Sequence, residues 1–134
     1  MKDFQLLIEK AYEGQSHAYA PYSGFCVGAA VLTSGGRIYT GCNIENASYG
    51  ATNCAERTAV FKAVSEGEKH ISAIAIVGPK GRYTYPCGIC RQVIAEFADE
   101  HTAVVLAKNP DEYIVKTMEQ ILPGAFSRAD LQEK

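Results

Sequence analysis

Three cysteines of this sequence stand where their chemistry can be used. Cys54 lies in the run NCAERTAV, with an acid, Glu56, two positions later and a base, Arg57, three positions later. Cys87 and Cys90 form a Cys-x-x-Cys pair in the run PCGIC. Thiolates bind metals or act as nucleophiles, and a neighbouring carboxylate can accept and donate protons. These residue types in this spacing favour a metal centre or a redox site.

Both cysteine clusters stand at predicted helix starts. The pattern becomes helical at Cys54, where Asn53 is the expected N-cap, and again over 87–100, where Pro86 suits the beginning of a helix. A spacing of three residues puts both sulfurs of the second cluster on one side of its helix. Helix N-termini stabilise thiolates because the positive ends of the backbone dipoles face them.

The elements that must position these thiols follow from apolar periodicity and turn residues. We expect helices at 3–18, 54–66 and 87–100, and strands at 27–33, 37–45, 73–78, 102–108 and 112–118. This order predicts a three-layer α/β/α arrangement around a mixed five-stranded sheet. The first two strands should form an antiparallel hairpin, and the passage from 73 to 108 a right-handed parallel crossover. Both cysteine-bearing helices would then begin at the same edge of the sheet.

Length and charge limit the class of protein. The 134 residues suit one domain, 1–134, and the net charge of −2 disfavours a nucleic acid or an anionic membrane as partner. No apolar run approaches the ~20 residues of a membrane span. The N-terminal run MKDFQLLIEK lacks the apolar core of a signal peptide. We therefore expect a cytoplasmic protein.

A disulfide framework is disfavoured for two reasons. The five cysteines are an odd number, and the cytosol keeps thiols reduced. Cys26 and Cys42 lie in strand-like runs and fit the usual role of a free cysteine as a small buried apolar residue. A redox Cys-x-x-Cys would need a thioredoxin-like setting and would leave Cys54 and Glu56 without a role. A purely structural core does not fit the polar residues around the other three cysteines.

A zinc site is the remaining interpretation. A structural zinc has four protein ligands, but the sequence offers no good fourth one. Three ligands leave the fourth position for water, which is the arrangement of a catalytic zinc that supplies hydroxide near neutral pH. Glu56 is placed to handle the protons of that water. The rival is a binding module without activity, in which zinc has a fourth protein ligand and only holds the loops.

The paired motifs resemble the signature of the zinc deaminases, in which Cys-x-Glu is followed by Pro-Cys-x-x-Cys and the glutamate is the acid/base group. The runs GCNIENASYG, NCAERTAVFKAVSEG, PCGICRQ and LPGAFS are similar to stretches of the small homotetrameric cytidine deaminases, over nearly the whole chain. LPGAFS narrows the resemblance to the enzymes that act on free nucleosides. One departure is Tyr85, which stands before Pro86 where many members have serine.

The resemblance implies a cytidine deaminase-like fold and the hydrolytic deamination of cytidine and 2′-deoxycytidine in pyrimidine salvage. It also implies one Zn²⁺ per subunit and a homotetramer whose active sites are shared between subunits. It implies no nucleic-acid or membrane partner. A zinc-dependent deaminase of another small aminopyrimidine or nucleoside analogue is the alternative.

The resemblance further assigns a role to each site residue. Cys54, Cys87 and Cys90 would bind zinc, and Glu56 would shuttle protons. The residues expected to bind substrate, some of them across a subunit boundary, are Phe25, Asn43, Glu45, Ala47, Tyr49, Ala55 and Phe126. Arg57 would donate hydrogen bonds to the thiolates, and Gln92 would lie near the zinc. From local sequence alone, both phenylalanines could be core residues, Asn43 could satisfy turn backbone, and Glu45 could be a solvated strand end.

Overall fold

The computed structural model describes residues 3–132. Its long helices are α1 (Gln5–Gln15), α2 (Ala55–Ser65) and α3 (Gly88–Phe97), and its short ones are η1 (Tyr49–Ala51), α4 (Met118–Ile121) and α5 (Arg128–Leu131). Its strands are β1 (Gly28–Thr33), β2 (Ile38–Cys42), β3 (Ile71–Val77), β4 (Ala103–Asn109) and β5 (Glu112–Lys116). Among these residues, no helix has the length and apolarity that a membrane crossing needs. Every predicted strand and long helix is present, whereas η1 and α5 were not predicted.

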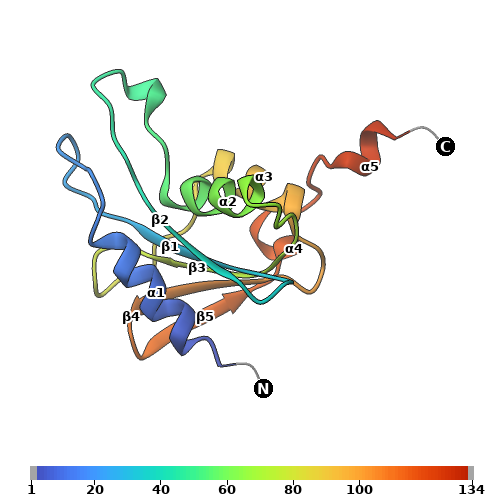
Figure 1. Ribbon diagram of the computed structural model, residues 1–134, viewed down its shortest axis with the longest axis horizontal. Helices are drawn as coiled ribbons and strands as arrows, with labels where there is room; N and C mark the ends of the chain where they lie inside the picture. The colour runs from blue at the N-terminus through green and yellow to red at the C-terminus, as the bar shows by residue number, and fades with distance from the viewer. Residues whose placement is uncertain (1–2, 133–134) are drawn as a thin grey trace.

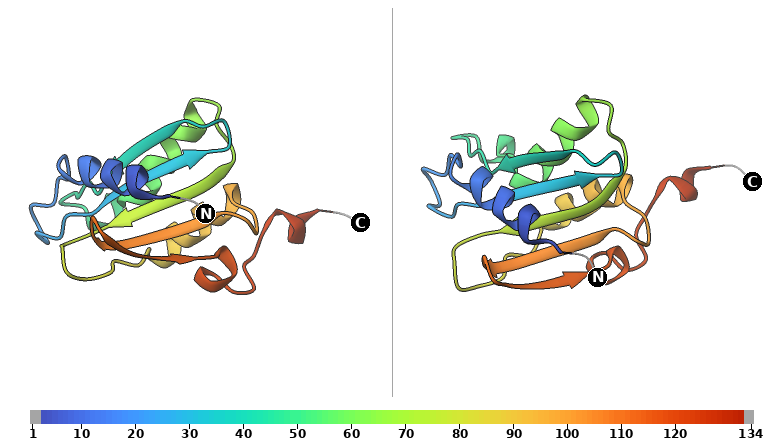
Figure 2. Two further views of the ribbon diagram at one scale, coloured as in Figure 1. Left: turned by 90° about the horizontal axis from the view of Figure 1, so that it is seen from below. Right: turned by 60° about the horizontal axis from the view of Figure 1, so that its bottom comes forward.

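The strands form one mixed sheet in the order β2-β1-β3-β4-β5. Helix α1 lies on one face, and α2 and α3 lie on the other (Figures 1 and 2). The predicted three-layer α/β/α fold with five strands is therefore confirmed. The alternation of side chains along β3 divides the core, since Ala73 and Ala75 face α1 while Ile74 and Ile76 face α2 and α3.

The strand directions bring the starts of α2 and α3 together. β1 is antiparallel to both β2 and β3, and β3 is parallel to β4. β2 and β3 therefore run in the same direction. Because α2 follows β2 along the chain and α3 follows β3, both helices begin at the edge where those strands end. The predicted hairpin and parallel crossover are both present.

The predicted N-cap of α2 is wrong by one residue. Cys54, not Asn53, is the N-cap, with an extended backbone at φ −81° and ψ 159°. The side-chain amide of Asn53 instead donates to Thr58 Oγ1 at 3.0 Å. The shift puts the Cys54 sulfur directly at the helix N-terminus. Gly67 follows the end of the helix at φ +93°, as expected for a stop.

Gly41 allows α2 to lie directly on β2. A Cβ atom at this position would be 2.4 Å from the carbonyl oxygen of Ala55 and 2.6 Å from the backbone nitrogen of Ala59. Both are backbone atoms of α2, so no side chain can rotate away. Because Gly41 has no side chain, the first turn of α2 can lie directly on β2. This contact fixes the position of the helix N-terminus, where Cys54 lies.

We expect Gly41→Ala to lower the free energy of unfolding by about 1–3 kcal/mol, because the added methyl group must push β2 away from α2. Urea denaturation of the variant and the wild type measures this difference. Gly50→Ala is the matched control, since a Cβ atom there meets nothing within 4 Å. Equal stability of Gly41→Ala and the wild type would contradict the close approach.

Candidate active site and metal centre

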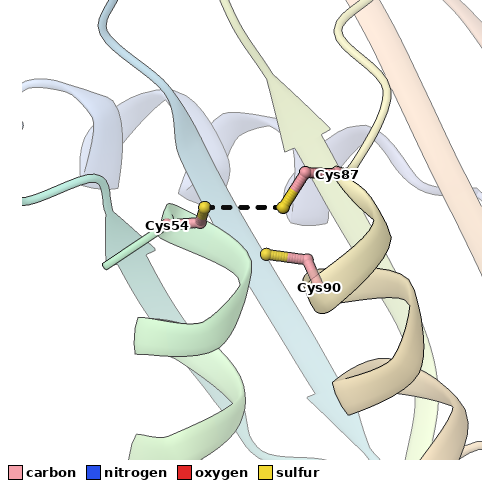
Figure 3. Close-up of side chains that lie close together, drawn as sticks. All are labelled: Cys54, Cys87 and Cys90. Carbon is pink, nitrogen blue, oxygen red and sulfur yellow. Dashed lines mark hydrogen bonds between the residues drawn. The ribbon is translucent and has the colours of Figure 1, made fainter. Parts of the chain in front are cut away.

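Three sulfur atoms meet between the starts of α2 and α3 (Figure 3). Cys54 is the N-cap of α2, Cys87 is the N-cap of α3, and Cys90 lies in the first turn of α3. The three sulfurs lie within 4.8 Å of one another, and those of Cys54 and Cys87 are 3.8 Å apart. Neither N-cap sulfur accepts a hydrogen bond from its own helix, so both face the cluster.

The sulfur cluster fits a zinc ion. Zinc–sulfur bonds of about 2.3 Å in a tetrahedron put the sulfurs about 3.8 Å apart, which matches the separation of Cys54 and Cys87. Thiolates are also a preferred donor set for zinc. Within residues 3–132, no carboxylate or imidazole joins the three sulfurs as a fourth ligand. The cluster can therefore bind one metal ion and leave one position open.

The surroundings favour negative charge on the cluster. The pKa of the Cys54 thiol is lowered to about 5, chiefly by hydrogen bonding with Cys90 and also by Arg57 and Cys87. The pKa of the Cys90 thiol is raised, chiefly by its hydrogen bond with Cys54 and also by burial. Because cysteines bind metals as thiolates, the lowered pKa of Cys54 favours metal binding at this cluster.

Arg57 contributes the positive side chain beside the cluster. Its Nη2 atom donates to the sulfur of Cys54 at 3.4 Å. Three thiolates outweigh the two positive charges of a zinc ion, and this excess would weaken the ion as a Lewis acid. The positive charge of the guanidinium and the positive ends of the two helix dipoles offset this excess negative charge.

Glu56 lies in the first turn of α2 with only 4% of its surface exposed. Burial raises the pKa of its carboxyl group to about 7, and the nearby charge of Cys54 adds to the rise while Arg57 opposes it. A carboxyl group with a pKa near neutrality can both accept and donate a proton in one cycle.

A cavity of about 210 Å³ opens beside the cluster. Its lining residues are Phe25, Val27, Asn43, Thr52, Cys54, Ala55, Glu56, Thr84, Tyr85 and Cys87. Pockets for drug-sized ligands start at roughly 300 Å³, so this cavity suits a smaller molecule. It brings together the predicted residues Phe25, Asn43, Ala55 and Glu56 with two of the cysteines. Tyr85, the departure from the family pattern, forms part of its wall.

Asn43 and Glu45 fix the loop that carries Phe25. The amide of Asn43 accepts from Val27 N at 2.9 Å and donates to the carbonyl oxygen of Phe25 at 2.7 Å. The carboxylate of Glu45 accepts from the backbone nitrogens of Tyr22 and Ser23. Asn43 therefore does satisfy turn backbone, as one interpretation of the sequence had it. Glu45 also binds backbone, so it is more than a solvated strand end.

Other predicted substrate residues lie outside this cavity. Glu45 and Tyr49 line an adjoining hollow of about 360 Å³, which shares Thr52 with the cavity. Ala47 is exposed in the loop before η1. Phe126 is 58% exposed and lies along the second half of α3, in a separate hollow.

Two consecutive residues of α3 connect the cysteine cluster to the C-terminal segment. Arg91 is not among the site residues predicted from the sequence, but its guanidinium donates to the carbonyl oxygens of Pro86 and Ile121, each at 2.7 Å. Gln92 donates to the carbonyl oxygen of Phe126 at 2.8 Å. The feature of the sequence that could have identified Arg91 as a site residue is its position next to Cys90 and one helical turn after Cys87.

We expect Arg57→Ala to weaken zinc binding by about 10- to 100-fold, the usual cost of removing a group that hydrogen-bonds a metal ligand. Competition with a chromophoric chelator measures the affinity directly. Arg37→Ala removes a guanidinium from the turn between β1 and β2 and serves as the matched control. Unchanged affinity in Arg57→Ala would show that the guanidinium does not support the cluster.

Known proteins are similar to this chain in sequence and in fold. A family model described as the cytidine and deoxycytidylate deaminase zinc-binding region matches residues 1–107. A cytidine deaminase from Halalkalibacterium halodurans is 49% identical over 131 residues, covering 98% of this chain and 99% of the relative. A cytidine deaminase from Sporosarcina psychrophila is 49% identical over 129 residues, covering 96% and 95%.

The fold agrees with the sequence comparison. The crystal structure of cytidine deaminase from Burkholderia pseudomallei matches with a TM-score of 0.87 at 45% identity, covering 93% of this chain and all of that one. Similarity of this extent, together with a three-sulfur cluster suited to zinc, supports one conclusion. The chain belongs to the cytidine and deoxycytidylate deaminase zinc-binding family.

Proposed function

We propose that this protein is a zinc-dependent enzyme that hydrolyses cytidine and 2′-deoxycytidine to the corresponding uridines and ammonia. The observation that carries the proposal is the cluster of three sulfurs at a small cavity with the buried carboxyl group of Glu56 beside it. The similar proteins that are named cytidine deaminase support this choice of substrate. The step belongs to pyrimidine salvage.

Zinc bound by the three cysteines would act as a Lewis acid and supply hydroxide near neutral pH. Glu56 would take a proton from the attacking water and deliver it to N3 of the cytosine ring while the water oxygen bonds to C4. It would then take the second proton of that oxygen and deliver it to the amino group, which leaves as ammonia when the C4–N bond breaks. Its pKa of about 7, raised by burial, suits both transfers. Cytosine would lie between Phe25 and the start of α2, where the backbone of Ala55 contacts the base.

Asn43 and Glu45 would bind the ribose hydroxyl groups. The amide of Asn43 uses one donor and one acceptor position within the protein and keeps a second of each. The pKa of Glu45 is lowered by its hydrogen bond from Ser23 and by two backbone N–H groups, so the carboxylate stays ionised and can accept from a hydroxyl. Their structural role in the loop is compatible with this second role.

Ala47, Tyr49 and Phe126 would complete the cavity of a neighbouring subunit. All three are exposed, and none of them lines the cavity of its own chain. Tyr49 is 75% exposed and packs edge to face on Tyr22, which is also exposed, and adjoining exposed apolar groups often mark a contact with another molecule. We therefore propose a homotetramer with shared active sites.

Residues 1–134 would form a single domain. Its place of action would be the cytoplasm, where reducing conditions keep the three cysteines free to bind zinc.

We expect the wild-type protein to remove the ultraviolet absorbance band of cytidine, and a chelator to prevent this. Glu56→Gln should keep zinc but lower the rate by at least ~10²-fold, because the amide cannot transfer protons. Zinc content measured beside the rate separates a chemical defect from loss of metal. Activity of Glu56→Gln within a few-fold of wild type would remove Glu56 from the mechanism. Turnover of another aminopyrimidine but not of cytidine would favour the alternative substrate class.

We expect hybrid oligomers of two weakly active variants, Glu56→Gln and Phe126→Ala, to recover part of the activity. Some cavities of a hybrid would combine an intact Glu56 from one chain with an intact Phe126 from its neighbour. Differently tagged chains, unfolded together and refolded, allow purification of the hybrids for the assay. Hybrids that are no more active than the average of the two parents would count against shared sites.

A further inference from the structure

Arg82 has no role in the proposed mechanism, yet it lies against Phe25, which forms one wall of the cavity. The centre of its guanidinium is 4.9 Å from the centroid of the Phe25 ring, within the range of a cation–π contact. Phe25 lines the cavity, whereas Arg82 does not. The guanidinium therefore covers the ring from outside the cavity.

The loop that presents Arg82 has a fixed shape. Gly81 has φ +95°, which favours glycine, and its backbone nitrogen donates to the carbonyl oxygen of Lys108 at 2.8 Å. Thr84 packs so closely on Gly78 that a Cβ atom there would be 2.9 Å from the Thr84 Cβ atom. The loop thus joins the end of β3 to Cys87 along a defined path and holds Arg82 over Phe25.

The hydrogen bonds around Phe25 fix its backbone but not its ring. The nitrogen of Phe25 donates to Ser23 Oγ at 3.0 Å, and its carbonyl oxygen accepts from Asn43. The ring itself is only half-buried and forms no hydrogen bond. The contact with Arg82 restricts the motion of this ring. Arg82 lies more than fifty residues later in the sequence.

We propose that Arg82 is a positioning residue: its guanidinium holds the ring of Phe25 as a wall of the cavity and thereby raises the affinity for the pyrimidine nucleoside. This inference rests on the proposed function. Arg82 does not line the cavity and is not among the charged groups that shift the pKa of Cys54 or Glu56, so it affects binding of the substrate and not the proton transfers.

The test compares Arg82→Met with the wild type in the zinc-loaded protein, using cytidine as the substrate. Methionine keeps an unbranched side chain but removes the positive charge. We expect KM to rise by about two- to fivefold with kcat unchanged, since this is the range of an exposed cation–π contact. Arg82→Lys should restore part of the affinity, because an ammonium group can also lie over the ring.

Lys80 provides a matched control within the same loop. Its ammonium group lies 5.8 Å from the centroid of the Tyr12 ring, which belongs to α1 on the opposite face of the sheet. Lys80→Met removes the same charge and a similar contact, but Tyr12 does not line the cavity. We expect its KM to equal that of the wild type.

A double-mutant cycle separates an effect through Phe25 from a direct contact with substrate. In a Phe25→Leu background, Arg82→Met should raise KM no further. A wild-type KM in Arg82→Met, a fall in kcat alone, an equal effect of Lys80→Met, or a full effect in the Phe25→Leu background would each overturn the inference while leaving the deaminase proposal intact. A zinc-loaded wild-type protein without cytidine deaminase activity would overturn both.

Discussion

The site depends on one constraint: two helix N-termini must begin side by side at one edge of the sheet. This is achieved because β2 and β3 run in the same direction and each is followed by a cysteine-bearing helix. Three thiols at one point repel each other as they ionise, so they need compensating positive charge. The two N-termini and Arg57 provide it at the place where the sulfurs meet. The same compensation keeps the thiolates available as metal ligands.

The remaining parts of the cavity come from loops that are fixed to this edge. The segment before β1 carries Phe25, and the segment after β2 carries Asn43 and Glu45, which bind its backbone. β1 begins where β2 and β3 end, since Gly28 pairs with both Cys42 and Val77. The wall of the cavity and the metal ligands therefore share one rigid support, and functional residues on loops gain the precision of the sheet.

Helix α3 connects this centre to the C-terminal segment. Its first residues hold two of the three sulfurs, while Arg91 and Gln92 hold the carbonyl oxygens of Ile121 and Phe126. Helix α5 stands away from the sheet (Figure 1), with Leu131 73% exposed. Helix α3 joins this C-terminal segment to the sulfur cluster of the same chain.

The sequence by itself determined the strands, the long helices and the layer order, because helix periodicity and turn residues are local signals. It also singled out Cys54, Cys87 and Cys90 by their positions at helix starts. It could not determine that Cys54 would replace Asn53 as the N-cap, that Arg91 would reach Ile121, or that Arg82 would lie over Phe25. The first depends on which of two adjacent residues takes the cap position, and the other two depend on contacts between segments far apart in the chain. Only the tertiary structure decided that Phe126 stays outside its own cavity, since a local pattern shows that a residue is aromatic but not which surface it will face.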